Sequence, residues 1–250
     1  MKRLITFISL QLFILTLCYA TDFDSLTVRI KGMRCDECAH KVMVAVRQLP
    51  GIESVRSNTE RRVTTVVFNP HLTSADSIKA RLQATKRYAP SPYSPNDVIR
   101  RGMGLHMDDM HCQKCADRIT KRLSSMDGID SLSAHLDKHY FFIRYDANRT
   151  CKDSIRATLT QMGYTPVSHY TDPKVAFAYY IIPKEQATQE SIDEVLMIGE
   201  AIEDANVNPR SGALAVTYFK NEISAEALLE AIRQTGIKAE VPKPHECSEE

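Results

Sequence analysis

The sequence predicts an α+β protein made of tandem ferredoxin-like βαββαβ units, three in number, with the third degenerate. The first observation behind this prediction is an internal repeat. A shift of 77 residues, the separation of Cys35 and Cys112, aligns most of one unit with the next without a gap. Apolar positions fall on apolar positions, and the turn glycine Gly51 falls on Gly128, as a tandem duplication requires.

The second observation is the order of hydrophobic patterns inside the first unit. Residues 26–30 alternate between apolar and polar, as strands do, and residues 39–46 place apolar side chains at helical spacing. Two further strand patterns cover residues 54–58 and 63–68, and Thr73 with an acidic residue three positions later predicts the start of a second helix. A strand following that helix completes the split βαβ plan, with two helices on one face of an antiparallel sheet.

A third copy of the unit is fainter. A further shift of 73 residues keeps the apolar positions and a turn glycine, pairing Ile119 with Ile192, Leu123 with Leu196 and Gly163 with Gly236. At that shift Cys112 falls on Glu185 and Cys115 on Thr188, so the third unit retains a core and lacks both thiols.

Proline- and serine-rich stretches at residues 88–97 and 170–174 predict the joints between units. The expected organisation is a signal segment at 1–20, unit one at 24–90, unit two at 97–170, unit three at 174–242 and a tail at 243–250.

The first twenty residues predict a cleavable secretory signal. Lys2 and Arg3 precede a short apolar run, and a small-residue site ends at Ala20. The run is too short for a typical membrane span, so we expect cleavage rather than retention as an anchor. A lipid-modified Cys18 fits less well, because Thr16 and Leu17 are not the small residues that such sites prefer. We therefore expect an exported protein, periplasmic or secreted.

Charge and cysteine usage narrow the function classes. The formal charge is +1 and becomes −1 without the leader, which offers neither a nucleic-acid footprint nor a polybasic membrane patch. Six of the seven cysteines lie beyond the leader: Cys35, Cys38, Cys112, Cys115, Cys151 and Cys247. An even count in an exported protein suggests disulfides, but four of the six form C-x-x-C pairs, a spacing equally typical of metal and redox chemistry.

Each C-x-x-C pair is expected between a strand and the start of a helix. A helix N-terminus lowers a thiol pKa and so favours the thiolate that metals require. Two thiolates from one short loop can hold a soft ion, whereas a structural zinc site uses four ligands. Cys38 and Cys112 belong to different units and are too far apart in sequence for a typical four-cysteine zinc site.

The two stretches GMRCDECAHKV, residues 32–42, and DMHCQKCADRI, residues 109–119, resemble the heavy-metal-associated domain. This resemblance implies binding of a soft ion, Cu(I) above all, with Hg(II), Zn(II) or Cd(II) in some branches. It also implies metal transfer by thiolate exchange with a metal transporter or another C-x-x-C protein. Arg34 and His111 stand where the family motif usually has threonine, and Asp109 replaces the motif glycine.

Neighbouring residues are expected to support these loops. Met33 and Met110 are interpreted as core residues under the cysteine loops rather than as ligands. Lys86 and Tyr164 lie in the loop that follows the second helix, at the same end of each unit, where the resemblance places a lysine or tyrosine beside the metal. His111 adjoins Cys112 and is a candidate third ligand, which would shift the preference toward Zn(II).

Two other functions remain open alongside an exported metallochaperone or metal-sequestering protein. The first is a thiol–disulfide redox protein, although the chain has no tryptophan and so lacks the aromatic-preceded motif of thioredoxins. The second is a non-catalytic interaction module that docks to a metal transporter. No nucleophile triad, phosphate loop or paired-carboxylate site is recognisable, so we do not expect an enzyme. The sequence does not settle the metal, the partner, the oligomeric state, or the roles of the third unit, Cys151 and Cys247.

Overall fold

The structure is a computed structural model that describes residues 22–242. The chain divides into two compact units at Pro95 and Asn96, and the second unit contains two of the three repeats. Within residues 22–242 no helix has the length and apolarity needed to cross a membrane. The predicted signal segment, the end of the tail and Cys247 lie outside the described residues.

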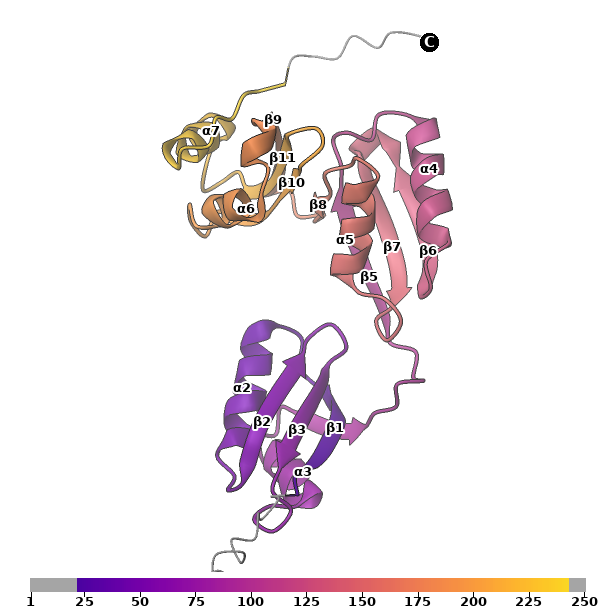
Figure 1. The fold of residues 1–250 in the computed structure, drawn as a ribbon, viewed down its shortest axis with the longest axis vertical. Helices are drawn as coiled ribbons and strands as arrows, with labels where there is room; N and C mark the ends of the chain where they lie inside the picture. Colours follow the sequence, from indigo (N-terminus) through magenta and orange to yellow (C-terminus); the bar gives the residue numbers. More distant parts are fainter. Residues whose placement is uncertain (1–21, 243–250) are drawn as a thin grey trace, which may run out of the picture. The chain divides into compact units, whose positions relative to one another are not determined.

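The first unit is a single module with two helices on one face of a four-stranded antiparallel sheet (Figure 1). Its elements are β1 (Asp24–Lys31), α2 (Asp36–Arg47), β2 (Ile52–Asn58), β3 (Val63–Phe68), α3 (Ala75–Ala84) and β4 (Ala89–Pro92), in the sheet order β2-β3-β1-β4. The alternating strands and the apolar helix faces meet in one core, in which Ile30, Val42 and Leu82 are fully buried.

Two details of this module correct the sequence predictions. Residues 88–97 do not form a joint throughout, because Tyr88 is buried and β4 pairs with β1 inside this stretch. Proline-rich strands are tolerated at a sheet edge, which is the position of β4. The second helix is capped by Ser74, whose hydroxyl accepts a hydrogen bond from the Ser77 amide, and not by Thr73.

The second module repeats the same plan. It comprises β5 (Arg100–His106), α4 (Gln113–Ser124), β6 (Ile129–His135), a 3₁₀ turn (Leu136–Lys138), β7 (Tyr140–Asp146), α5 (Lys152–Gln161) and β8 (Val167–Ser168). The strand order β6-β7-β5-β8 is equivalent to that of the first module, with β8 shortened to two residues.

The third module has lost most of its last strand. Its elements are β9 (Val175–Ile181), a 3₁₀ turn (Lys184–Gln186), α6 (Gln189–Leu196), β10 (Ile202–Asn208), β11 (Ala213–Phe219) and α7 (Ala225–Gln234). The sheet order is β10-β11-β9, and one bridge between Ile181 and Glu240 is what remains of a fourth strand. The predicted α+β class of ferredoxin-like repeats with a degenerate third copy is confirmed.

The predicted alignment of the third module is wrong in its first helix. α6 begins after Thr188 as α4 begins after Cys112, a shift of 76 rather than 73. α6 has 8 residues against 12 in α4, so the shift returns to 73 only at the next strand. Thr188 and Ser191 therefore occupy the two cysteine positions.

The hydroxyl of Thr188 accepts a hydrogen bond from the Ser191 amide at 3.4 Å, and Cys112 Sγ accepts one from the Cys115 amide at the same distance. The third module thus keeps the cap geometry and replaces sulfur with oxygen.

The third module packs against the second through the sheet face that carries no helices. On this face β11 places three buried residues, Ala213, Ala215 and Thr217. Asp204 accepts two short hydrogen bonds, from Arg156 at 2.8 Å and from the Ser168 amide at 2.7 Å. The two modules are therefore joined by a specific polar contact within one compact unit.

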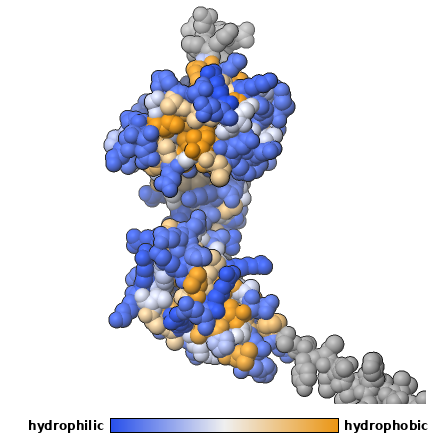
Figure 2. Space-filling model, turned by 90° about the vertical axis from the view of Figure 1, so that its left-hand side faces the viewer, coloured by the Kyte–Doolittle hydropathy of each residue, from blue (hydrophilic) through white to orange (hydrophobic). Residues whose placement is uncertain are grey.

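The surface is more hydrophilic than the cores. Figure 2 shows one face of the molecule, on which hydrophilic residues surround smaller apolar areas. The most exposed large apolar side chain in the described part of the chain is Met197, 84% exposed, just after α6.

Candidate metal centres

The first thiol pair lies at the start of α2. Cys35 is the N-cap residue in extended conformation, and its Sγ accepts a hydrogen bond from the Cys38 amide at 3.3 Å. Cys35 is exposed and Cys38 is buried, with 2.6 Å between their sulfur atoms. One sulfur therefore faces solvent, where a metal can arrive, while the other anchors the pair to the helix.

The two thiols of this pair differ in pKa. A hydrogen bond from Cys35, and then one from the Arg34 backbone, lower the pKa of Cys38 from 9.0 to about 7. The same contact raises the pKa of Cys35, because Cys35 donates its proton to the Cys38 thiolate and therefore releases it less easily. Near neutral pH Cys38 is therefore partly ionised to the thiolate, the form of sulfur that binds metal.

Arg87 provides the charged support at this site. Its guanidinium donates a hydrogen bond to Cys38 Sγ at 3.7 Å and lies 5.6 Å from the ring centre of the buried Tyr88. The prediction favoured Lys86 for this role, but Lys86 adopts a left-handed turn conformation, with φ of 57°, and its side chain is exposed. The contact with the thiol is made by the next residue along the chain.

The shape of the first loop depends on Gly32 and Met33. Gly32 has a φ of 97°, and an added Cβ would lie 2.4 Å from the Arg87 carbonyl oxygen. Only glycine fits this conformation and this close approach without strain. Met33 is fully buried below the loop, so its side chain is part of the core.

The second thiol pair has the same local structure as the first. Cys112 is the N-cap of α4, its Sγ accepts from the Cys115 amide at 3.4 Å, and the two sulfurs lie 3.1 Å apart. Cys112 is exposed and Cys115 is half-buried. Met110 is fully buried below this loop, as Met33 is below the first.

Tyr164 supports the second pair in place of a charged side chain. Arg118 donates a hydrogen bond to the Tyr164 hydroxyl at 2.5 Å, and its guanidinium lies 5.2 Å from the centre of that ring. Burial raises the pKa of the Cys115 thiol, but hydrogen bonds from Cys112, Tyr164 and the backbone outweigh burial and leave the pKa below its ordinary value. Tyr164 thus links the cation of Arg118 to the second sulfur.

Asp109 changes the second loop. It stands where the first loop has Gly32, and its carboxylate accepts a hydrogen bond from the Thr165 hydroxyl at 2.9 Å. Burial raises the pKa of Asp109 to about 6. The glycine-dependent turn of the first loop is therefore replaced by a side-chain contact to the loop that carries Tyr164.

The third module braces that loop. The fully buried Asn208, in β10, donates hydrogen bonds to the Tyr164 carbonyl at 3.0 Å and to the Thr160 carbonyl at 3.4 Å. Asn206 donates to the Pro166 carbonyl at 2.8 Å. The role of these two asparagines was not predicted from the sequence, because an isolated asparagine in a strand carries no periodic or motif signal.

His111 is exposed, and its ring meets that of His139 edge-on at 6.0 Å. In residues 22–242 no three His, Cys, Asp or Glu side chains are placed to hold a metal ion together. The structure does not bring His111 into a three-donor group with Cys112 and Cys115. Cys151 is also separate, since it caps α5 and its thiol lies 3.1 Å from the Ser154 hydroxyl.

Chemically, each centre offers two soft sulfur donors at a helix N-terminus, with a cation close by. Metal–thiolate bonds of about 2.3 Å, the value for zinc, require the two sulfurs to separate around a bound ion. The exposed cysteine of each pair is free to make that movement. Such a pair suits a two-coordinate soft ion better than a closed four-ligand ion.

Comparison with known proteins identifies the modules. A model of the heavy-metal-associated domain matches residues 27–88 and 105–165, which are the two thiol-bearing modules. A copper-exporting P-type ATPase of Staphylococcus saprophyticus is 28% identical over 145 residues, covering 58% of this chain and 17% of that protein. Copper-transporting ATPase 1 of Rattus norvegicus is 19% identical over 273 residues, covering 87% of this chain and 18% of that protein.

Among solved structures, the N-terminal soluble domains of Bacillus subtilis CopA align with 61% of this chain and 98% of their own, at 18% identity and a TM-score of 0.28. A TM-score this low adds no argument of its own. The chain spans less than a fifth of the length of the two curated ATPases.

The first two modules belong to the heavy-metal-associated domain family. Membership in this family indicates that these two modules bind metal.

Proposed function

We propose that the chain binds Cu(I) at two independent two-thiol centres, Cys35 with Cys38 and Cys112 with Cys115, and hands the ion on. The observation that carries this proposal is the shared cap geometry, in which an exposed thiol sits beside a second thiol of lowered pKa. A Cu(I) ion held by two thiolates has one net negative charge. Arg87 at the first centre and Arg118 at the second lie where they stabilise that charge.

Transfer would proceed by thiolate exchange. An incoming thiol of the partner binds the metal while its proton passes to the cysteine sulfur that leaves, so charge is conserved at each step. The exposed Cys35 and Cys112 are the sulfurs that a partner can reach. The partner is a metal transporter or another C-x-x-C protein, a proposal supported by the similarity to copper-transporting ATPases.

The protein acts outside the cytoplasm as a carrier or store of metal, and not as an enzyme, in this proposal. The leader-like first twenty residues support export. Hg(II), Zn(II) and Cd(II) are the competing ions, and a two-sulfur centre disfavours Zn(II), which takes four ligands in structural sites.

Anaerobic titration tests the proposal. Reduced protein is titrated with Cu(I) against a competing chelator, and we expect two equivalents to bind. Cys35→Ser and Cys112→Ser should each remove one equivalent, and the double variant should bind none. Cys151→Ser is the matched control, because Cys151 also stands at a helix N-cap position but has no second cysteine three residues on, and this variant should still bind two equivalents.

Uptake of no Cu(I) by reduced wild-type protein would refute the proposal. Thiol–disulfide reductase activity without competitive metal uptake would favour the redox alternative.

A further inference from the structure

A basic groove lies in the second compact unit and shares Arg118 with the support of the second thiol pair. Its volume is about 620 Å³, and it is lined by Arg118, Lys121, Arg122, Ser125, Gln161, Met162 and Arg210. The first four belong to α4 or its C-cap and the next two to the C-terminal end of α5. Arg210 comes from the β10–β11 turn of the third module, so the groove exists only where these two modules meet.

The charges in the groove are not balanced. Four of the seven lining residues are cations and none is a carboxylate. Within residues 22–242, none of these four cations takes part in an ion pair. Arg118 donates to the Tyr164 hydroxyl and Arg122 to the Ser125 hydroxyl, both neutral acceptors. Like charges gathered in a concave surface repel one another, and a bound anion relieves that repulsion.

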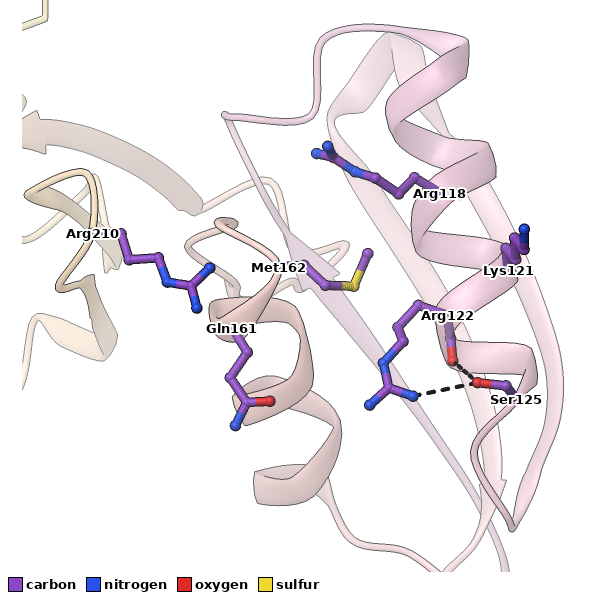
Figure 3. A pocket seen from close by; sticks show the side chains of 7 residues that line it. All are labelled: Arg118, Lys121, Arg122, Ser125, Gln161, Met162 and Arg210. Carbon is purple, nitrogen blue, oxygen red and sulfur yellow. Dashed lines mark hydrogen bonds between the residues drawn. The ribbon is translucent and has the colours of Figure 1, made fainter.

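The side chains are oriented to meet a ligand. Figure 3 shows Arg118 and Arg122 extending from α4 and Arg210 extending from the opposite side, with Met162 between them. A guanidinium presents a planar fork of N–H donors that matches two oxygens of a carboxylate or phosphate. Three such forks around one hollow suit a ligand with several anionic oxygens.

The other repeats show that the fold does not require this charge. In the first module, Lys121 and Arg122 correspond to Val44 and Ala45 at the shift of 77. Arg118 corresponds to Lys41, whose charge is already paired with Glu37.

The turn residue Arg210 corresponds, through shifts of 73 and 77, to Asp137 in the second module and Glu60 in the first. The sign of the charge is reversed only at the turn that reaches this groove. The cations therefore gather where the second and third modules pack together rather than at every copy of the helix pair.

We propose that this groove binds a small polyvalent oxyanion, one that presents several phosphate or carboxylate oxygens. The volume falls within the range of small-molecule sites, and Met162 provides an apolar floor between the arginines. No cysteine lines the groove, so the inference does not depend on metal binding.

Calorimetric titration of metal-free protein with inorganic pyrophosphate, and separately with citrate, tests the site. We expect one equivalent of at least one of these anions to bind, with affinity that falls as salt rises. If only pyrophosphate binds, the groove recognises phosphate oxygens. If only citrate binds, it recognises carboxylate oxygens. If both bind, the charge of the anion rather than its shape determines binding.

The decisive variant is Arg122→Ala with Arg210→Ala, since both side chains are exposed. Loss of two charge-assisted contacts should weaken binding by about tenfold or more. The control is Arg47→Ala with Lys86→Ala, two exposed cations of the first module, which makes the same change in net charge. The control should bind as the wild type does.

No binding of either anion, or equal weakening in the control, would overturn the proposal. Repeating the titration with the Cys35→Ser and Cys112→Ser double variant keeps this result separate from the proposed function. Anion binding by that variant supports the groove even if the thiols bind no metal.

Discussion

The two thiol pairs have the same local structure but differ in the residues that support them. In both, the first cysteine caps a helix through its sulfur and a methionine fills the core below. The first pair is supported within its own module, by Arg87 and the glycine turn at Gly32. The second depends on Tyr164, whose loop is held by the third module.

The third module lacks both thiols and instead supports the second thiol centre. Its sheet face is free to serve as a brace, and Asn208 binds the loop of the second centre. One copy has kept the fold, replaced both sulfurs with hydroxyls at Thr188 and Ser191, and become a support for its neighbour. The first centre is therefore supported by its own module, whereas the second is braced by the third module.

The largest effect is expected from removing the Asp204 side chain, which connects the third module to the second. Asp204→Ala leaves Arg156 and the Ser168 amide without their partner in a half-buried contact, which should cost about 3 kcal/mol. Denaturant unfolding should show the second unit destabilised and the first unchanged. Arg100→Ala, which removes an exposed ion pair with Asp130, is the control and should cost less than about 1 kcal/mol. Equal losses in the two variants would refute the brace.

The pH dependence of thiol reactivity should distinguish the two sulfurs of the first pair. Because the pKa of Cys38 is lowered to about 7, its thiolate persists down to that pH and is lost below it. Alkylation of metal-free protein, followed by mass spectrometry of each cysteine, should show Cys38 half-maximally reactive near pH 7. The pKa of Cys35 is raised, so its reactivity should rise only at higher pH. The reverse order would contradict the assignment of the thiolate to Cys38.

Asn208→Ala should affect the second centre selectively. The change removes a buried donor to the Tyr164 and Thr160 carbonyls, at a cost of about 1–2 kcal/mol. Cu(I) competition should show weaker binding at Cys112 and Cys115, with the first centre as an internal reference. Asn58→Ala, at the equivalent position in the first module, should leave the second centre unchanged. Equal weakening of both centres by Asn208→Ala would argue against a local brace.

The smallest effect is expected from Tyr164→Phe. Loss of the hydroxyl removes one hydrogen bond that lowers the pKa of Cys115 and also the acceptor of Arg118. The pKa of Cys115 should rise and its alkylation at neutral pH should slow by a few-fold, with Cys38 unaffected. A pKa of Cys115 that stays constant would show that Tyr164 only fills space.

The sequence revealed the elements that repeat and missed those that do not. The 77-residue match located all four paired cysteines, because the same residues recur in the same local pattern. It did not distinguish Lys86 from Arg87, since one left-handed turn residue decides which side chain reaches the sulfur. The strand β4 was obscured by its prolines.

The third module shows a second limit of prediction from sequence. A helix shorter by four residues shifted the alignment locally and hid Thr188 and Ser191 as the equivalents of the cysteines. The packing of the second and third modules was also not predicted. It rests on isolated polar residues such as Asp204 and Asn208, whose role appears only once distant strands are brought together.

X-ray absorption at the copper edge, on protein loaded with two equivalents of Cu(I), tests whether each ion is held by two sulfurs of one module. We expect two sulfur neighbours per copper, with no imidazole nitrogen and no copper–copper contact. Nitrogen scattering of the kind His111 would give, or three or more sulfurs around each ion, would contradict it.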